Sequence, residues 1–210
     1  MWISLLSVLI VVSAALTISA EYHGPKRHVY LFKPLTVILI ILLAFMPKYP
    51  VAPFYRYMIV AGLVCSLVGD MFLMLPSNRF IQGLLSFLVA HIFYIAAFAF
   101  SGERTLSKWA ALPLLIYGVV MVCWLWSFLG KMKAPVIIYM LVILLMAWMA
   151  LSRYLETGVS GSFLAALGSI FFLASDSILA VNKFKSGFRS AQLHILITYF
   201  MAQWLIALST

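Results

Sequence analysis

Eight apolar stretches, each 17 to 21 residues long and separated by short polar breaks, constrain this chain more than any other feature. A helix needs about 20 consecutive apolar residues to cross the hydrocarbon core of a bilayer. The stretches are residues 1–20, 30–46, 55–75, 80–100, 109–129, 135–151, 162–181 and 191–208. We therefore predict an all-α, polytopic membrane helix bundle of eight transmembrane helices, forming one integral membrane domain over residues 1–210. The second and sixth stretches are the shortest, so their boundaries are the least defined.

The composition excludes soluble enzyme folds. Hydrophobic residues make up 66% of the 210 residues and charged residues only 9%, whereas a soluble domain is about half apolar and a quarter charged. The net charge of +9 does not indicate a nucleic-acid partner, because membrane proteins concentrate Lys and Arg in cytoplasmic loops. We expect membrane lipids as partners and no nucleic acid. The first stretch has no Lys or Arg before it, so we expect a retained helix there and not a cleaved signal peptide.

The distribution of Lys and Arg predicts the orientation of the bundle. Short breaks make sequential helices antiparallel, so alternate breaks lie at the same face of the membrane. The first, third, fifth and seventh breaks, with the helix ends beside them, hold nine of the fourteen Lys and Arg residues. By the positive-inside rule this face is cytoplasmic and both termini are outside. We expect the protein in the inner, cytoplasmic membrane of a bacterium.

The third and fourth stretches share a pattern with the seventh and eighth. In each pair a glycine precedes an aspartate by eight residues, and the aspartates are Asp70 and Asp176. Similar segments then follow, NRFIQG at 78–83 and NKFKSG at 182–187. The pattern indicates two parallel four-helix repeats related by an axis along the membrane normal, and chance similarity near helix ends is the alternative.

Asp70 and Asp176 are the only acids within the apolar stretches. A charged carboxylate in hydrocarbon costs several kcal/mol unless it is protonated, paired or in a water-filled cavity. Each aspartate lies six residues before the break that follows it, so a rise of about 1.5 Å per residue places both roughly 9 Å below the same face. We predict that they form a catalytic pair. The alternative is a structural role, in which each makes an interhelical hydrogen bond with Ser66, Ser175 or a tyrosine.

Further polar residues are candidates for binding a substrate beside the aspartates. Lys33, at the start of the second helix, could pair with one carboxylate or bind a lipid phosphate, and the alternative is a lysine whose amine extends to the interface. His91, Tyr94 and His194 could hydrogen-bond an aspartate or orient water. The predicted substrate-binding residues, which come from five of the apolar stretches, are Lys33, Ser66, His91, Tyr94, Ser175 and His194.

The sequence carries no signature of a metal or cofactor site. The two histidines and two aspartates lack the spacing of three or four residues that would place two zinc ligands on one helix face. The Gly-x-Ser-x-Gly elbow, the phosphate-binding loop and the dinucleotide fingerprint are absent. We therefore expect neither a metal nor a cofactor.

Four segments resemble the lysoplasmalogenase family of YhhN-like membrane proteins. They are FKPL at 32–35, GLVCSLVGD at 62–70, SFLVAHIFY at 86–94 and the Ser-Asp pair at 175–176. The resemblance implies a lysophospholipid substrate, a lysoplasmalogen, whose sn-1 vinyl ether bond is hydrolysed to a fatty aldehyde and glycerophosphoethanolamine or glycerophosphocholine. It also implies that Asp70 and Asp176 are the functional aspartates.

A pair of carboxylates suits this reaction on chemical grounds as well. A vinyl ether hydrolyses when its β-carbon is protonated, forming an oxocarbenium ion that water captures. Two carboxylates close together in a low dielectric cannot both ionise, so one would stay protonated and donate the proton. The other would stabilise the cation and activate water, as paired carboxylates do for sugar oxocarbenium ions. The sequence leaves open which aspartate has which role.

Two other functions fit part of the pattern. An intramembrane aspartyl protease also places two aspartates on facing helices, but position 67 is leucine where that class has the first glycine of Gly-x-Gly-Asp. A proton-coupled transporter would explain the repeat and the acids within the membrane, although the aspartates are expected toward one face and not at the centre.

Overall fold

The computed structural model describes residues 2–46, 48–75, 79–100 and 106–210, and the described residues are helical apart from short connections. The eight long helices are α1 (Trp2–His23), α2 (Lys26–Ala44), α3 (Pro53–Met74), α4 (Phe80–Ala99), α5 (Lys108–Leu125), α6 (Lys133–Thr157), α7 (Ser160–Ala180) and α8 (Ala191–Leu208). A 3₁₀ turn, η1 (Gly130–Met132), precedes α6, and a π-helical turn, η2 (Val181–Lys185), follows α7.

All eight helices are long and apolar enough to cross a membrane, which confirms the predicted helical bundle. Helices form because the hydrocarbon core offers no water, so the backbone must satisfy its hydrogen bonds within each segment. The third and fourth predicted breaks, at 76–79 and 102–104, lie wholly or largely outside the described residues.

Three predicted boundaries differ from the structure by four residues or more: the start of the second helix, the end of the fifth, which lies at 125 and not 129, and the end of the sixth. The first of them matters for the site. The second helix begins at Lys26 and not at residue 30, because it continues through a polar first turn that hydropathy does not count. Lys33 therefore lies about two turns inside α2 and not at its start. The sixth helix continues six residues beyond 151. In the last turns of this helix the guanidinium of Arg153 packs on Tyr55, 4.1 Å from the centroid of the ring. Gly158 then ends the helix with a φ of 62°, which glycine adopts without strain.

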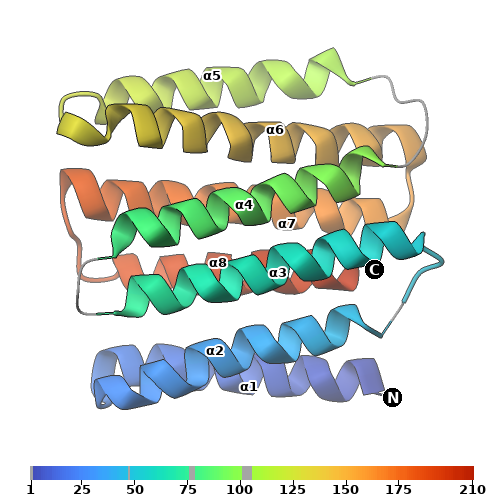
Figure 1. The fold of residues 1–210 in the computed structure, drawn as a ribbon, viewed down its shortest axis with the longest axis horizontal. Helices are drawn as coiled ribbons and strands as arrows, with labels where there is room; N and C mark the ends of the chain where they lie inside the picture. The colour runs from blue at the N-terminus through green and yellow to red at the C-terminus, as the bar shows by residue number, and fades with distance from the viewer. Residues whose placement is uncertain (1, 47, 76–78, 101–105) are drawn as a thin grey trace.

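Successive helices run antiparallel (Figure 1). The odd-numbered helices all end on the left of Figure 1, where the even-numbered helices begin, and both termini lie on the right. We call the left-hand end the basic end, because the first residues of α2 and the lysines of η2 lie there. This arrangement agrees with the alternation that the short breaks predict.

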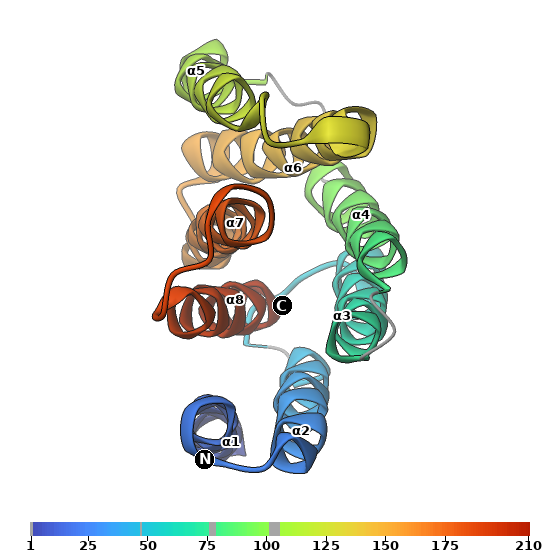
Figure 2. The same cartoon turned by 90° about the vertical axis from the view of Figure 1, so that its left-hand side faces the viewer.

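The packing of the first four helices is repeated by the last four. Viewed from the basic end, α1 and α2 lie at one extreme of the bundle and α5 and α6 at the other, with α3 and α4 facing α7 and α8 (Figure 2). Each helix packs against the next one within its half, α2 packs against α8, and α6 packs equivalently against α4. Equivalent helices also run in the same direction (Figure 1). The contacts therefore support two parallel repeats.

Glycines allow close helix contacts within each half. Gly62 on α3 faces Tyr94 on α4, where a Cβ atom would lie only 2.3 Å from the tyrosine ring. Gly168 on α7 faces α8, where a Cβ atom would lie 2.8 Å from Cγ1 of Ile206. These are the glycines that precede the two aspartates by eight residues. The sequence pattern thus corresponds to one packing arrangement used twice.

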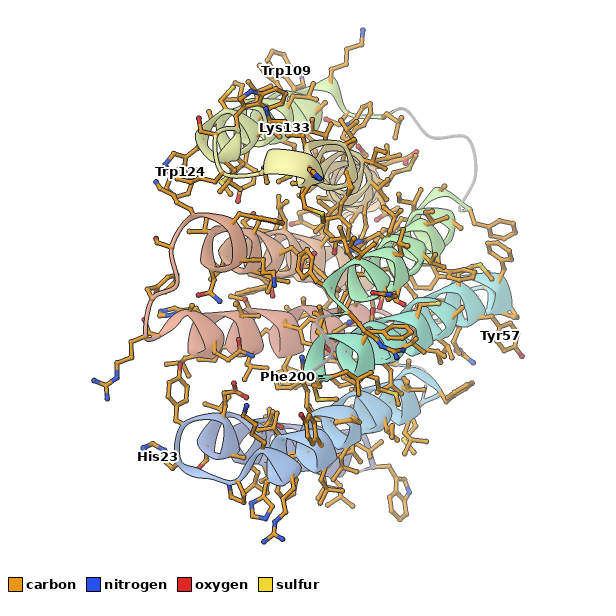
Figure 3. All side chains as sticks on the ribbon, turned by 60° about the vertical axis from the view of Figure 1, so that its left-hand side comes forward. His23, Tyr57, Trp109, Trp124, Lys133 and Phe200 are labelled. Atoms are coloured by element: carbon orange, nitrogen blue, oxygen red, sulfur yellow. The ribbon has the colours of Figure 1, made fainter. Side chains whose placement is uncertain are left out.

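The outer surface carries many large apolar side chains, as expected of a surface that contacts lipid. Trp109 is 86% exposed and Tyr57 is 60% exposed, and both lie at the outer edges of the bundle (Figure 3). Phe200 on α8, in contrast, is buried in the core cluster (Figure 3). Tryptophan and tyrosine on the outer surface favour the membrane interface, where their polar atoms reach water.

Candidate active site

A cavity of about 360 Å³ lies at the basic end, between α2, α3 and α4 on one side and α7 and α8 on the other. This volume is within the range of small-molecule sites, roughly 300–1,000 Å³. Its polar lining residues are Glu21, Lys26, Tyr30, Lys33, Asp70, Ser175, Asp176, Asn182, Lys183, Gln192 and Tyr199. The remaining wall is apolar, so the cavity suits an amphiphilic molecule. Both predicted catalytic aspartates line it.

Asp70 receives two donors at the wall of this cavity. Nζ of Lys33 on α2 lies 2.8 Å from its Oδ1, and the hydroxyl of Tyr199 on α8 donates to its Oδ2 at 2.6 Å. The aspartate is 1% exposed. A buried carboxylate needs such partners, because an unpaired charge there would cost several kcal/mol. The three residues come from three helices, and the hydrogen bond from Tyr199 on α8 ties the first half of the bundle to the second.

Lys33 reaches Asp70 because α2 begins earlier than hydropathy suggests. Its position about two turns into α2 places the side chain inside the bundle, where it is 8% exposed. Its Nζ also lies 5.8 Å from the ring centroid of Tyr199. Lys33 was expected either to pair with a carboxylate or to bind a lipid phosphate, and the structure contains the pairing with a carboxylate.

Gln203 extends the hydrogen bonds of Asp70 into the core. Its Nε2 donates to the hydroxyl oxygen of Tyr199 at 3.1 Å, and its Oε1 accepts from the hydroxyl of Tyr94 at 2.8 Å. Because the tyrosine oxygen already accepts from Gln203, the proton of Tyr199 is directed to Asp70. Gln203 and Tyr94 are completely buried. They therefore act on the site by positioning Tyr199, and they do not line the cavity.

Asp176 has a different environment from Asp70. Its Oδ2 accepts a hydrogen bond from the hydroxyl of Tyr139 on α6. Among the described residues no ion pair is formed by Asp176. Its neighbour Ser175 lines the same cavity and donates from Oγ to the backbone carbonyl of Ile195 at 3.2 Å. One aspartate is thus paired with a cation, and the other is held by a neutral hydroxyl.

With this geometry established, similarity to known proteins identifies the family. The model of the YhhN family matches residues 28–210, a range that includes both aspartates and their hydrogen-bond partners. This chain belongs to the YhhN family. It is an integral membrane protein, as the eight apolar helices require.

Individual relatives fall into two groups. The membrane protein YhhN of Escherichia coli O157:H7 is 28% identical over 204 residues, which cover 96% of each chain. Lysoplasmalogenase TMEM86A of Homo sapiens is 36% identical over 157 residues, covering 72% of this chain and 64% of the human protein. Lysoplasmalogenase TMEM86B of Homo sapiens is 34% identical over 155 residues, covering 74% and 64%. No solved structure matches the chain significantly.

Within this family member, several predicted substrate-binding residues lie away from the cavity. Ser66, His91 and Tyr94 are fully buried and do not line it. Both ring nitrogens of His91 lack a hydrogen-bond partner, and the ring packs 4.6 Å from that of Phe172 and 5.3 Å from that of Tyr139 between centroids. His194 is exposed, and its Nδ1 lies 2.7 Å from the carbonyl oxygen of Ser190. The structure therefore places Lys33 and Ser175 in the cavity with the aspartates but none of these four residues, and Tyr94 is connected to Asp70 only through Gln203 and Tyr199.

Three residues of the site were not singled out from the sequence. Tyr139 and Tyr199 bind the aspartates, yet they are two of ten tyrosines in a chain where tyrosine is common at helix ends. Gln203 gives the clearer signal, because it lies twelve residues into the last apolar stretch, where an amide needs a partner. Within the described residues, no cluster of His, Cys, Asp or Glu could hold a metal ion.

Proposed function

We propose that this protein is a lysoplasmalogenase, which hydrolyses the sn-1 vinyl ether bond of a lysoplasmalogen to a fatty aldehyde and a glycerophosphodiester. The observation that carries the proposal is a cavity with polar and apolar walls that holds two aspartates, a buried Asp70 paired with Lys33 and a partly buried Asp176 without a cation. The similarity to human lysoplasmalogenases supports the substrate class.

The different environments of the aspartates suggest their roles. Asp70 binds an ammonium group and a tyrosine hydroxyl, and both partners favour a charged carboxylate. Asp176 also accepts from a tyrosine hydroxyl, but it has no cation and it borders a largely apolar groove, and these surroundings favour a protonated acid when Asp70 is charged. Asp176 is accordingly the general acid, and Asp70 is the base that also stabilises positive charge.

The reaction then proceeds with a complete balance of protons. Asp176 transfers its proton to the β-carbon of the vinyl ether, and the double-bond electrons form the new C–H bond, leaving an oxocarbenium ion beside the Asp70 carboxylate. Asp70 takes a proton from the water that attacks this ion, and a hemiacetal results. The hemiacetal hydroxyl returns a proton to Asp176 while Asp70 protonates the departing glycerol oxygen. One water is consumed, and both aspartates return to their initial states.

The charge distribution suggests how a lysolipid enters. The basic end is cytoplasmic if the positive-inside rule holds, with both termini outside the inner membrane of a bacterium. Lys26 and Lys183 line the cavity at that end, where they would attract the phosphate of a lysolipid in the inner leaflet. The vinyl ether would then reach the depth of the aspartates while the headgroup stays near water.

Product identity separates this proposal from its alternatives. We expect purified protein to release aldehyde from a lysoplasmalogen, but neither fatty acid from an acyl lysophospholipid nor fragments from a transmembrane peptide. Peptide fragments would instead support an aspartyl protease. A complete absence of products, together with substrate-dependent proton movement across proteoliposomes, would support a proton-coupled transporter.

A further inference from the structure

A second, narrow groove of about 40 Å³ lies on the other side of Asp176, between α4, α6 and α7. Leu84 on α4, Met140 and Ile143 on α6, and Leu173 on α7 line it without lining the first cavity. The groove spans eight residues along α6, from Val136 to Ile143, and the seven rises between them measure about 10 Å at 1.5 Å per residue.

The few polar groups in this groove already have partners. The hydroxyl of Tyr139 donates to Asp176. Oγ of Ser177 donates to the carbonyl oxygen of Leu173 at 2.7 Å and lies 2.6 Å from the hydroxyl of Tyr117, which donates to it. The groove therefore offers apolar contact and little free hydrogen-bonding capacity, so it suits a hydrocarbon and not a headgroup.

The groove adjoins the first cavity, and Asp176 lines both. Leu73, Phe80, Phe87 and Leu179 are walls of both, and Asp176 is the one ionisable group that they share among the described residues. A molecule with its polar part in the first cavity and a chain in the groove would thus place the junction between these parts at Asp176. In a lysoplasmalogen that junction is the vinyl ether.

The groove reaches from Val136 and Phe184, near the basic end, past Asp176 and toward the middle of the membrane. Leu173 lies three residues earlier on α7, which runs toward the basic end, and Ile143 lies ten residues into α6, which runs away from it. Both therefore lie deeper than Asp176. A lipid chain whose headgroup is at the basic end would point in this direction.

From this adjacency we infer that the groove binds the aliphatic chain of the substrate, with its first methylene groups between Asp176 and the deep end formed by Ile143 and Leu173. The inference rests on the proposed function for the identity of the reacting bond. By this inference Ile143 and Leu173 determine which lipid chain lengths the protein accepts. It also explains why the carboxyl of Asp176 borders both a polar cavity and an apolar groove.

Chemical cross-linking tests chain binding without turnover. The Asp176→Asn protein is incubated with a lysophosphatidylcholine that carries a diazirine in the first part of its chain, and the labelled residues are identified after irradiation. We expect labels on Met140, Ile143 or Leu173, and competition by unlabelled lysophosphatidylcholine. Labels confined to lipid-facing residues such as Ile138, which is 54% exposed, would overturn the inference whatever reaction the protein catalyses.

A chain-length series provides the second measurement. We expect Ile143→Trp to reduce kcat/KM for a 16-carbon vinyl ether by about tenfold more than for a 4-carbon one, which is about 1.4 kcal/mol of discrimination. Ile138→Trp adds the same bulk to the outer face of α6 and should leave this ratio unchanged. Equal losses at both lengths in a folded Ile143→Trp protein would contradict the inference. Absence of aldehyde from the wild type would refute the proposed function alone, because the cross-linking result stands independently.

Discussion

Nζ of Lys33 and Oδ1 of Asp70 lie 2.8 Å apart, on adjacent helices and almost completely shielded from solvent. The pair joins a lysine from the beginning of the chain to one of two acids in the apolar segments. Because Tyr199 from the last helix completes the cluster, the ion pair lies where the two halves of the bundle meet. Its strength depends on all three groups remaining in place.

Removing the ammonium group tests this relationship. Lys33→Met should leave a buried carboxylate without its cation, so we expect destabilisation by about 3–5 kcal/mol and a kcat at least about tenfold lower. Thermal unfolding in detergent and aldehyde release measure the two effects. Lys48→Met, in the connection at the opposite end, is the matched control. A variant that changes only KM would instead assign Lys33 to phosphate binding.

Both aspartates should be required for turnover. Asp70→Asn and Asp176→Asn preserve side-chain volume but remove the groups that transfer protons, so we expect a loss of about 10²–10⁴-fold in kcat for each. Circular dichroism and gel filtration establish that the variants remain folded. Glu156→Gln makes the same chemical change outside the cavity and should retain activity. Substantial activity in either folded aspartate variant would end the proposal of a catalytic pair.

Gln203 should affect catalysis through Tyr199. Gln203→Leu removes the partner of two buried tyrosine hydroxyls, which costs about 1–3 kcal/mol of stability and leaves Tyr199 less firmly directed at Asp70. We expect kcat to fall while KM changes little, because Gln203 lies outside the cavity. Gln82→Leu, at an exposed position on α4, is the control. A change in KM with constant kcat would indicate direct contact with substrate.

Replacing either of the two helix-contact glycines, Gly62 or Gly168, should destabilise the protein to a similar extent. Gly62→Ala would force a methyl group against Tyr94, and Gly168→Ala would place one 2.9 Å from the carbonyl oxygen of Ala202. We expect each to lower stability by about 1–3 kcal/mol, seen as a lower midpoint of thermal unfolding. Gly187→Ala is the control, since its nearest contact would be 3.6 Å away. Similar stability for all three variants would contradict the tight packing of α3 on α4 and α7 on α8.

Cysteine labelling tests the orientation. Single cysteines at Ser186 and Val159, at opposite ends of the seventh transmembrane segment, are introduced after Cys65 and Cys123 are replaced by alanine. In intact cells an impermeant thiol reagent should label Val159→Cys and not Ser186→Cys. The opposite pattern would invert the orientation. Labelling of both from outside would contradict a single crossing of the membrane by this segment.

The number, type and order of the helices follow from local sequence. An apolar stretch of sufficient length must be helical in hydrocarbon, whatever its neighbours are, so the limits of α8 at 191 and 208 agree with the structure. The start of α2 does not follow in this way, because its first turn is polar and lies outside the hydrocarbon. The depth of Lys33 within α2 therefore differs from the prediction, whereas its pairing with a carboxylate was one of the predicted possibilities.

The candidate site likewise has a part that the sequence predicts and a part that depends on how the helices pack. Asp70 and Asp176 are identifiable from sequence alone, because an acid in an apolar helix is costly wherever it lies and therefore needs a reason. The hydrogen-bond partners of the aspartates cannot be identified from the sequence alone, since Tyr199 lies 129 residues from Asp70 in the chain and Tyr139 lies 37 residues from Asp176. Which tyrosine meets which aspartate, and which aspartate receives the lysine, depends on how the helices pack. The sequence alone therefore determined the helices and the two acids, and only the tertiary structure decided that the acids have different environments.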